Sequence, residues 1–240
     1  MAELLYSRLD SWLGLQAPRL IVTILATLLF LLIGLIAYRR SRSVPSVVLF
    51  LTASAIVIAG FLVPRPVIFS LALLAAVVVA DSDRRMRWTL PVLMWAWASV
   101  HASFALGLAY LALRAVGRGI GWKRLIDLFI VGLPTLVTAH GLGVFDFLLG
   151  FFTNRDALGY LDEWAKPDLL SISVLPLFAG LLALIWLSGK GQLERCDWWV
   201  IVPFLALAFS STRAVPPAWI VLSPILGRVD VRFRSTSATR

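Results

Sequence analysis

Cysteine is almost absent from this 240-residue sequence, which contains only Cys196. A single cysteine forms no disulfide within the chain and no cysteine-based zinc cluster. Histidine is also scarce, with two residues, and 13 acidic residues stand against 22 lysines and arginines. No GxSxG, HExxH or CxxC motif occurs, so the sequence lacks the signatures of a serine hydrolase, a zinc protease and a dithiol site. We therefore expect no resident cofactor and no metal-site residues, while a divalent metal is left open.

Apolar residues are abundant: 60% of the chain is hydrophobic and its mean hydropathy is +0.90. Long apolar runs of this kind predict an all-α polytopic membrane protein with a single membrane domain over residues 1–240. The net charge of +9 comes from lysines and arginines in short loops between apolar runs. That placement indicates membrane topology and contact with membrane lipids, and we expect no nucleic-acid partner.

The apolar runs predict about seven spanning helices. They cover approximately residues 20–38, 44–63, 67–80, a stretch beginning near 125, 169–187, 198–209 and 215–226. Residues 1–19 have the spacing of an amphipathic helix lying on the membrane surface, and their charged residues are not arranged as in a cleavable signal peptide. Residues 146–168 form an outer loop, and residues 227–240 form a basic tail.

The segment 88–114 is apolar almost throughout, yet it carries His101 near its middle. An ionisable side chain inside a membrane segment points to function. Basic residues flank both ends, which places both ends inside, and the segment is too short for two full crossings of about 20 residues each. We expect a re-entrant pair of short helices with His101 near the outer tip. The alternative is one long span whose histidine is satisfied by a neighbouring helix.

This layout can be checked against the charges in the loops. It puts sixteen of the 22 lysines and arginines inside. Because basic loops stay on the cytoplasmic side, the bias predicts an outer N-terminus and a cytoplasmic C-terminus.

Three cationic or ionisable residues then lie on the outer side: Arg65, His101 and Arg213. Arg65 stands between two prolines, which makes its turn rigid. The planar donors of arginine match phosphate oxygens, so these residues are candidates for binding a lipid-linked phosphate. The alternative is that each arginine is an interfacial anchor that extends to the head groups.

Further polar residues form a possible second outer site. They are His140, Asp162, Glu163, Trp164 and Asp168. The carboxylates have the chemistry of a general base or a metal ligand, although solvation is commoner in an exposed loop. Trp164 fits either a sugar face or the aromatic belt of a membrane protein.

Several of these stretches agree in order and spacing with one family over most of the chain. They are Arg65-Pro66, Trp97-Ala98-Ser99-Val100-His101 with Phe104 and Gly107-Leu108, Glu163-Trp164-Ala165-Lys166-Pro167-Asp168, and Arg213 with Val215-Pro216. The set resembles bacterial polytopic proteins of the GT-C glycosyltransferase-like class. The resemblance implies a bacterial plasma membrane location and a polyprenyl-phosphate-linked sugar as donor on the outer face.

The chain departs from that pattern at several positions. Val67 replaces a glutamine, Ser99 replaces an asparagine, and Thr138-Ala139-His140-Gly141 replaces Asn-Pro-Tyr-Gly. The resemblance also implies a first helix and an outer loop with the catalytic base, which would precede this sequence. Either the start codon is misplaced or the gene product is shortened.

The resemblance therefore implies a GT-C-like core that is inactive alone, with a membrane protein partner that could supply the missing part. The alternative is a non-catalytic scaffold, partner subunit or binder of lipid phosphates. A small transporter is less favoured, because no pair of matching broken helices is visible.

Overall fold

The computed structural model describes residues 16–138, 143 and 164–229, and its regular elements are all helical there. The α-helices are α2 (Ala17–Ser41), α3 (Val44–Ile58), α4 (Val67–Ser82), α5 (Leu90–Val100), α6 (Phe104–Gly117), α7 (Trp122–Gly132), α10 (Leu175–Gly189), α11 (Arg195–Ser210) and α12 (Val215–Leu226). Short 3₁₀ turns include η2 (Ala59–Phe61), η4 (Leu133–Leu136) and η6 (Thr212–Ala214). The predicted all-helical class is confirmed for these residues.

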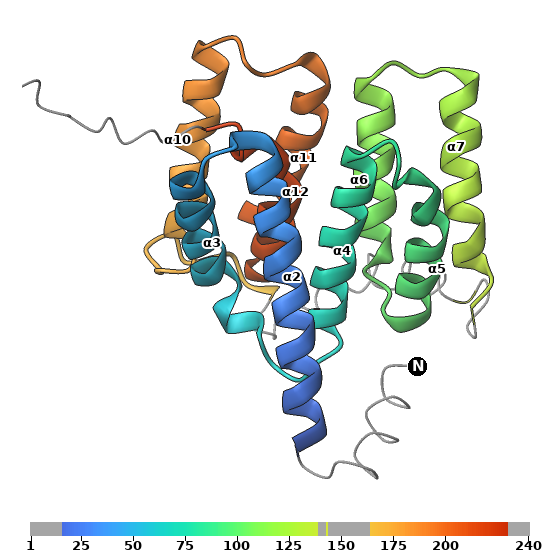
Figure 1. Ribbon diagram of the computed structural model, residues 1–240, viewed down its shortest axis with the longest axis horizontal. Helices are drawn as coiled ribbons and strands as arrows, with labels where there is room; N and C mark the ends of the chain where they lie inside the picture. The colour runs from blue at the N-terminus through green and yellow to red at the C-terminus, as the bar shows by residue number, and fades with distance from the viewer. Residues whose placement is uncertain (1–15, 139–142, 144–163, 230–240) are drawn as a thin grey trace, which may run out of the picture.

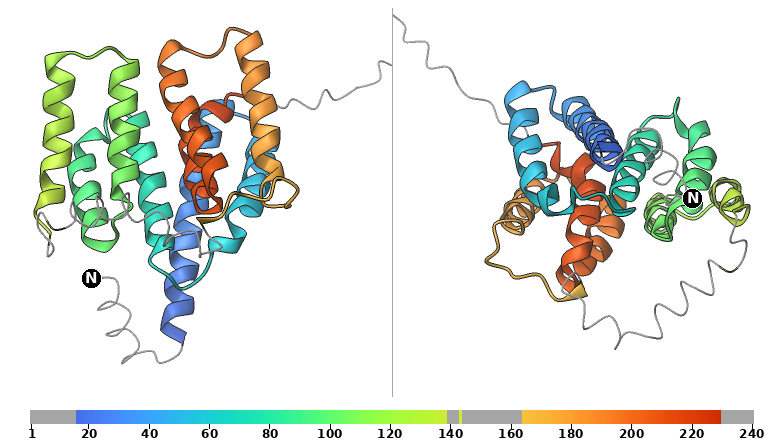
Figure 2. Two further views of the ribbon diagram at one scale, coloured as in Figure 1. Left: turned by 180° about the vertical axis from the view of Figure 1, so that it is seen from behind. Right: turned by 90° about the horizontal axis from the view of Figure 1, so that it is seen from below.

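The helices run up and down between two ends of the molecule (Figure 1). One end, here called the basic end, holds the connections α2–α3, α4–α5, α6–α7 and α10–α11 and the residues that follow α12 (Figures 1 and 2). Most of the described lysines and arginines lie in these connections or in the helix ends next to them. The opposite end holds the connections α3–α4, α5–α6 and α11–α12, and α2 projects beyond the other helices there.

The segment 88–114 folds as two short antiparallel helices, α5 and α6, which meet at a turn containing His101. Helices of 11 and 14 residues rise only about 16 and 21 Å, which is less than the ~30 Å hydrocarbon core of a bilayer. Both outer ends of the pair lie at the basic end. Its re-entrant position in a membrane stays a prediction.

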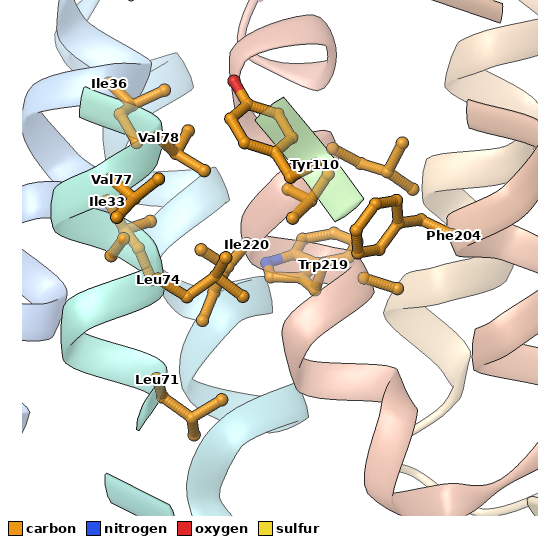
Figure 3. Close-up of a cluster of buried hydrophobic side chains, with 14 of the residues drawn as sticks. Ile33, Ile36, Leu71, Leu74, Val77, Val78, Tyr110, Phe204, Trp219 and Ile220 are labelled. Carbon is orange, nitrogen blue, oxygen red and sulfur yellow. The ribbon is translucent and has the colours of Figure 1, made fainter. Parts of the chain in front are cut away.

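The interior is built around α4 and α12. Every residue of α12 is buried, as are most of those of α4, so both helices are apolar on all sides. Figure 3 shows Leu74 of α4, Ile33 of α2 and Ile220 of α12 in one cluster. Trp219 stacks on Phe50 of α3 at 5.2 Å, and its indole N–H donates to Ser54 Oγ at 2.8 Å.

Apolar side chains also cover much of the outer surface. Two helices, Pro18–Ser41 and Val44–Phe61, are long and apolar enough to cross a membrane, and only 22% of each spanning window is buried inside the protein. A core helix of a soluble protein would be mostly buried. Exposed apolar residues continue on α7, α10 and α11, for example Phe129, Leu182 and Val202. These surfaces indicate membrane association.

Two buried aspartates join the helices at the basic end. The side chains of Asp81 and Asp197 are 6% and 0% exposed. Arg114 of α6 contacts both, at 3.2 Å from Asp81 Oδ2 and 3.7 Å from Asp197 Oδ1. Arg118 binds both oxygens of Asp81, and Arg228 binds both oxygens of Asp197 at 2.7 and 3.2 Å. These ion pairs connect α4, α6, α11 and the segment after α12.

The segment boundaries differ in three places from those expected. Residues 17–19 of the predicted surface segment belong to α2, while residues 1–15 lie outside the described part. The helix expected from residue 169 starts at Leu175, because residues 168–174 form successive turns. Arg228, which was placed in a basic tail over 227–240, is held by buried Asp197, whereas residues 230–240 lie outside the described part.

Replacing one buried carboxylate tests this network. Asp197→Asn removes the charge that faces Arg228 and Arg114, and we expect a loss of about 3–5 kcal/mol in the free energy of unfolding. Unfolding in detergent, followed by circular dichroism, measures the change. The matched control is Asp83→Asn, whose partner Arg39 lies at 3.3 Å in an exposed pair, with an expected loss below about 1 kcal/mol. Equal losses in the two variants would contradict the structural role given to Asp197.

Candidate functional site

A cavity of about 500 Å³ opens at the end opposite the basic end. It lies where the connections α3–α4, α5–α6 and α11–α12 meet, at the lower end of Figure 1. Its polar lining consists of Arg65, His101, Ser173, Thr212 and Arg213. The structure thus places the three predicted phosphate-binding residues on the wall of one cavity, although they are distant in sequence.

The rest of the wall is apolar and comes mainly from the end of α3 and the start of α4. It includes Val57, Phe61, Val63 and Val67. A second hollow of about 570 Å³ lies between α2 and α3, lined by residues such as Phe30, Leu51 and Leu62. Leu62 stands in the chain between Phe61 and Val63, so one short segment contributes to both hollows.

Arg65 owes its position to the two prolines that flank it. Its backbone N–H donates to the carbonyl oxygen of Val63 at 2.7 Å, and its own carbonyl accepts from Ile68 at 3.2 Å. Pro66 then precedes the first residue of α4 with helical backbone angles. Proline fixes its own φ and restricts the backbone of the residue before it, so this turn holds Arg65 just before the N-terminus of α4.

His101 ends α5 and is oriented by Ser103. The backbone N–H of Ser103 donates to His101 Nδ1 at 3.1 Å, and Ser103 Oγ lies 2.8 Å from the same nitrogen. Ser103 Oγ also accepts from the indole of Trp97 at 3.3 Å and lies 2.8 Å from Ser70 Oγ. Because Nδ1 accepts the backbone proton, the neutral ring carries its hydrogen on Nε2.

The environment keeps this imidazole neutral. Burial lowers the pKa of His101, and the positive charge of Arg213 lowers it further, to about 4. At neutral pH the ring is therefore an uncharged group on the cavity wall. The positive charge of the described lining comes from Arg65 and Arg213, and no carboxylate belongs to the described lining.

Arg213 lies in η6, the turn between α11 and α12. Its guanidinium stands over the ring of Trp164, 5.1 Å from the centroid. Both the backbone N–H and the hydroxyl of Thr212 donate to the carbonyl oxygen of Ala165, at 3.0 and 3.3 Å. These contacts connect the segment around Trp164 to η6, the turn that contains Arg213. Trp164 packs on a cation, a partner that neither sequence interpretation included.

The remaining predicted residues do not join the described cavity. Asp168 is exposed, and its Oδ1 accepts from the backbone N–H of Leu170 at 3.0 Å, so it stabilises a turn. His140, Asp162 and Glu163 lie outside the described residues. Within the ranges that the structure describes, no group of three or more histidine, cysteine or acidic residues is arranged to hold a metal ion.

Sequence reasoning missed Ser103 and Ser173 of this site and the buried aspartates of the basic end. Ser103 stands two residues after His101, and a polar neighbour in such a turn is a usable signal. For Asp197 the signal was its place three residues after Glu194, where the two side chains form a capping box before an apolar run.

No family model, no curated protein and no solved structure matches this chain.

The neutral state of His101 has a consequence for stability. An unfolded histidine takes up a proton near pH 6.5, whereas the folded ring does so near pH 4. The unfolded state therefore binds more protons as the pH falls between these values, and the folded protein loses stability over that window.

His101→Asn removes the titrating ring, while its side-chain oxygen can still accept from the Ser103 N–H. We expect the melting temperature of the wild type to fall more steeply than that of His101→Asn between pH 6.5 and pH 4. Thermal unfolding in detergent at half-unit pH intervals measures both curves. Parallel curves would show that His101 is protonated equally in the folded and unfolded chains.

Proposed function

We propose that the chain is a multi-pass membrane protein whose cavity binds the phosphate of a polyprenyl-type lipid on the outer side of the bacterial plasma membrane. The observation that carries this proposal is the joint position of Arg65, Arg213 and neutral His101 on the wall of one cavity. Two guanidinium groups supply paired donors for phosphate oxygens. The Nε2–H of His101 supplies a further donor.

The surface of the helices supports the membrane placement. Apolar side chains are exposed on α2, α3, α7, α10 and α11, where an aqueous protein would carry polar groups. The basic connections gather at one end, as expected for a cytoplasmic side, with α2 beginning on the outer side. In this placement about seven helices run across the membrane with the short α5–α6 pair dipping between them, although, of the described helices, only Pro18–Ser41 and Val44–Phe61 are long enough to span it by themselves.

The shape of the cavity supports an amphiphilic ligand. Its polar wall faces an apolar wall made by Val57, Phe61 and Val67. The hollow between α2 and α3 is apolar as well, because the hydroxyls of Thr23 and Thr27 donate to carbonyls of their own helix. The phosphate of such a lipid would bind the arginines of the polar wall, and its hydrocarbon chain would lie along the apolar surfaces.

Sugar transfer in the manner of the GT-C class is the second candidate. It is favoured by Trp164, which lies over Arg213 and presents an aromatic surface at the same turn. Transfer also needs a general base, for which Asp162 and Glu163 have the chemistry. Release of sugar from a polyprenyl-phosphate donor by the purified chain would favour this candidate, and binding without turnover would favour the first.

The topology can be tested by cysteine labelling in a Cys196→Ser background. Arg85→Cys and Gly121→Cys probe the two ends of the α5–α6 pair, and Leu170→Cys probes the opposite end, where this residue is 88% exposed. In intact cells we expect an impermeant maleimide to label position 170 only. After the membrane is opened, positions 85 and 121 should react as well. Labelling of positions 85 and 121 from different sides of the membrane would contradict the proposed topology.

The cavity can be tested by binding of a polyprenyl monophosphate to the purified chain. Arg65→Gln and Arg213→Gln each remove a charged donor, and a charge-assisted hydrogen bond worth about 1.5–3 kcal/mol predicts a Kd weaker by roughly 10- to 100-fold. Microscale thermophoresis in detergent measures the change. Arg19→Gln is the matched control, because Arg19 is an exposed arginine of the projecting end of α2 and does not line the cavity. Equal weakening by all three substitutions would indicate diffuse attraction.

A further inference from the structure

The basic end carries a second concentration of positive charge, remote from the cavity. Its centre is Asp197, whose oxygens accept from Arg228 at 2.7 and 3.2 Å and from the backbone N–H of Glu194 at 3.0 Å. Arg114 adds a fourth contact at 3.7 Å. Three hydrogen bonds and one ion pair thus compensate the charge of Asp197.

Arg40 stands beside this centre on the last turn of α2. The charges that act on it most are Arg228 and Arg114, which repel it, while Asp197 attracts it less. Within the described ranges no carboxylate lies at ion-pair distance from Arg40. Arg40 therefore faces two cations and one carboxylate, Asp197, that is already paired. An additional anion beside Arg40 would be stabilised by this excess of positive charge.

Packing fixes Arg40 in this position. α2 and α12 approach so closely that a Cβ atom added to Gly227 would stand 3.3 Å from Arg40 Cβ and 3.4 Å from Ala37 Cα. The stem of Arg40 is therefore held against the turn that carries Arg228. Arg40 is partly buried at its charged group by this packing, yet the residue as a whole is exposed, so a ligand can reach its side chain.

The two neighbouring arginines provide a contrast. Arg39 pairs with Asp83 at 3.3 Å, and Arg42 lies over the ring of Tyr38, 5.9 Å from its centroid. All three arginines occupy one helix end, yet their charges are compensated differently. If these arginines served only to keep this end of the protein in the cytoplasm, their charges would not need to be compensated in different ways.

We propose that Arg40, with Arg228 and Arg114, forms a binding site for the phosphate of an anionic phospholipid at the cytoplasmic face. The site rests on the membrane placement proposed above and is independent of the outer cavity. In that placement the end of α2 lies at the level of the head groups, and α2 presents exposed apolar residues such as Leu31 and Leu35 toward the acyl chains. The phosphodiester brings one negative charge to the unmatched cation, and arginine donors suit its oxygens.

The test uses the full chain in nanodiscs of phosphatidylcholine with increasing phosphatidylglycerol. Lipids retained on the protein are counted by native mass spectrometry. Arg40→Gln should weaken retention of phosphatidylglycerol by about fivefold or more, because a cationic side chain near an anionic membrane surface contributes roughly 1 kcal/mol. Arg39→Gln removes the same charge from the same turn, but Arg39 is already paired with Asp83, so retention should change by less than about twofold. Equal effects of the two substitutions would show diffuse attraction and overturn the site.

Two further measurements separate the remaining outcomes. In pure phosphatidylcholine, Arg40→Gln should melt no lower than the wild type, since it relieves repulsion from Arg228 and Arg114; a lower melting temperature would assign Arg40 a structural role instead. Millimolar inorganic phosphate should not displace the lipid, and displacement would assign the site to a free anion. Binding of polyprenyl phosphate at the outer cavity should be unchanged in Arg40→Gln, so loss of this site and loss of the proposed function are distinguishable.

Discussion

The ion pairs of Arg114 with Asp81 and Asp197 hold the described fold together at its basic end. Arg114 belongs to α6, Asp81 to α4 and Asp197 to α11, so one side chain joins three helices from two parts of the chain. Both carboxylates are buried, and charges in such places require compensation on every side. Inside a membrane the hydrophobic driving force between helices is weak, so polar contacts between them matter more. The ion pairs therefore supply the register that α4, α6 and α11 need.

Arginine has a different structural role at each end of the molecule. At the basic end Arg114, Arg118 and Arg228 are bound to buried carboxylates, whereas at the opposite end Arg65 and Arg213 line a cavity. The difference follows from chain geometry. Three short connections converge at the opposite end, and prolines or a 3₁₀ turn fix each arginine there.

The sequence predicted much of this arrangement and missed the rest for identifiable reasons. Apolar runs located the helices, and the charge of the loops located their ends, because both signals are local. The grouping of Arg65, His101 and Arg213 followed from assigning their turns to one side. The partners of Asp81 and Asp197 depend on which helices pack together, which composition does not encode. The contact of Trp164 with Arg213 is likewise a tertiary contact, and the hydrogen bond between Asp168 and Leu170 depends on backbone conformation.

The neutral imidazole of His101 limits the positive charge on the cavity that Arg65 and Arg213 also line. A third positive charge would add to the repulsion between them, and burial beside Arg213 prevents it by lowering the pKa of the ring. The bond from Ser103 N–H to Nδ1 leaves Nε2 as a donor, so His101 still offers a hydrogen to an anion. The ring therefore remains a hydrogen-bond donor that adds no charge to the cavity at neutral pH.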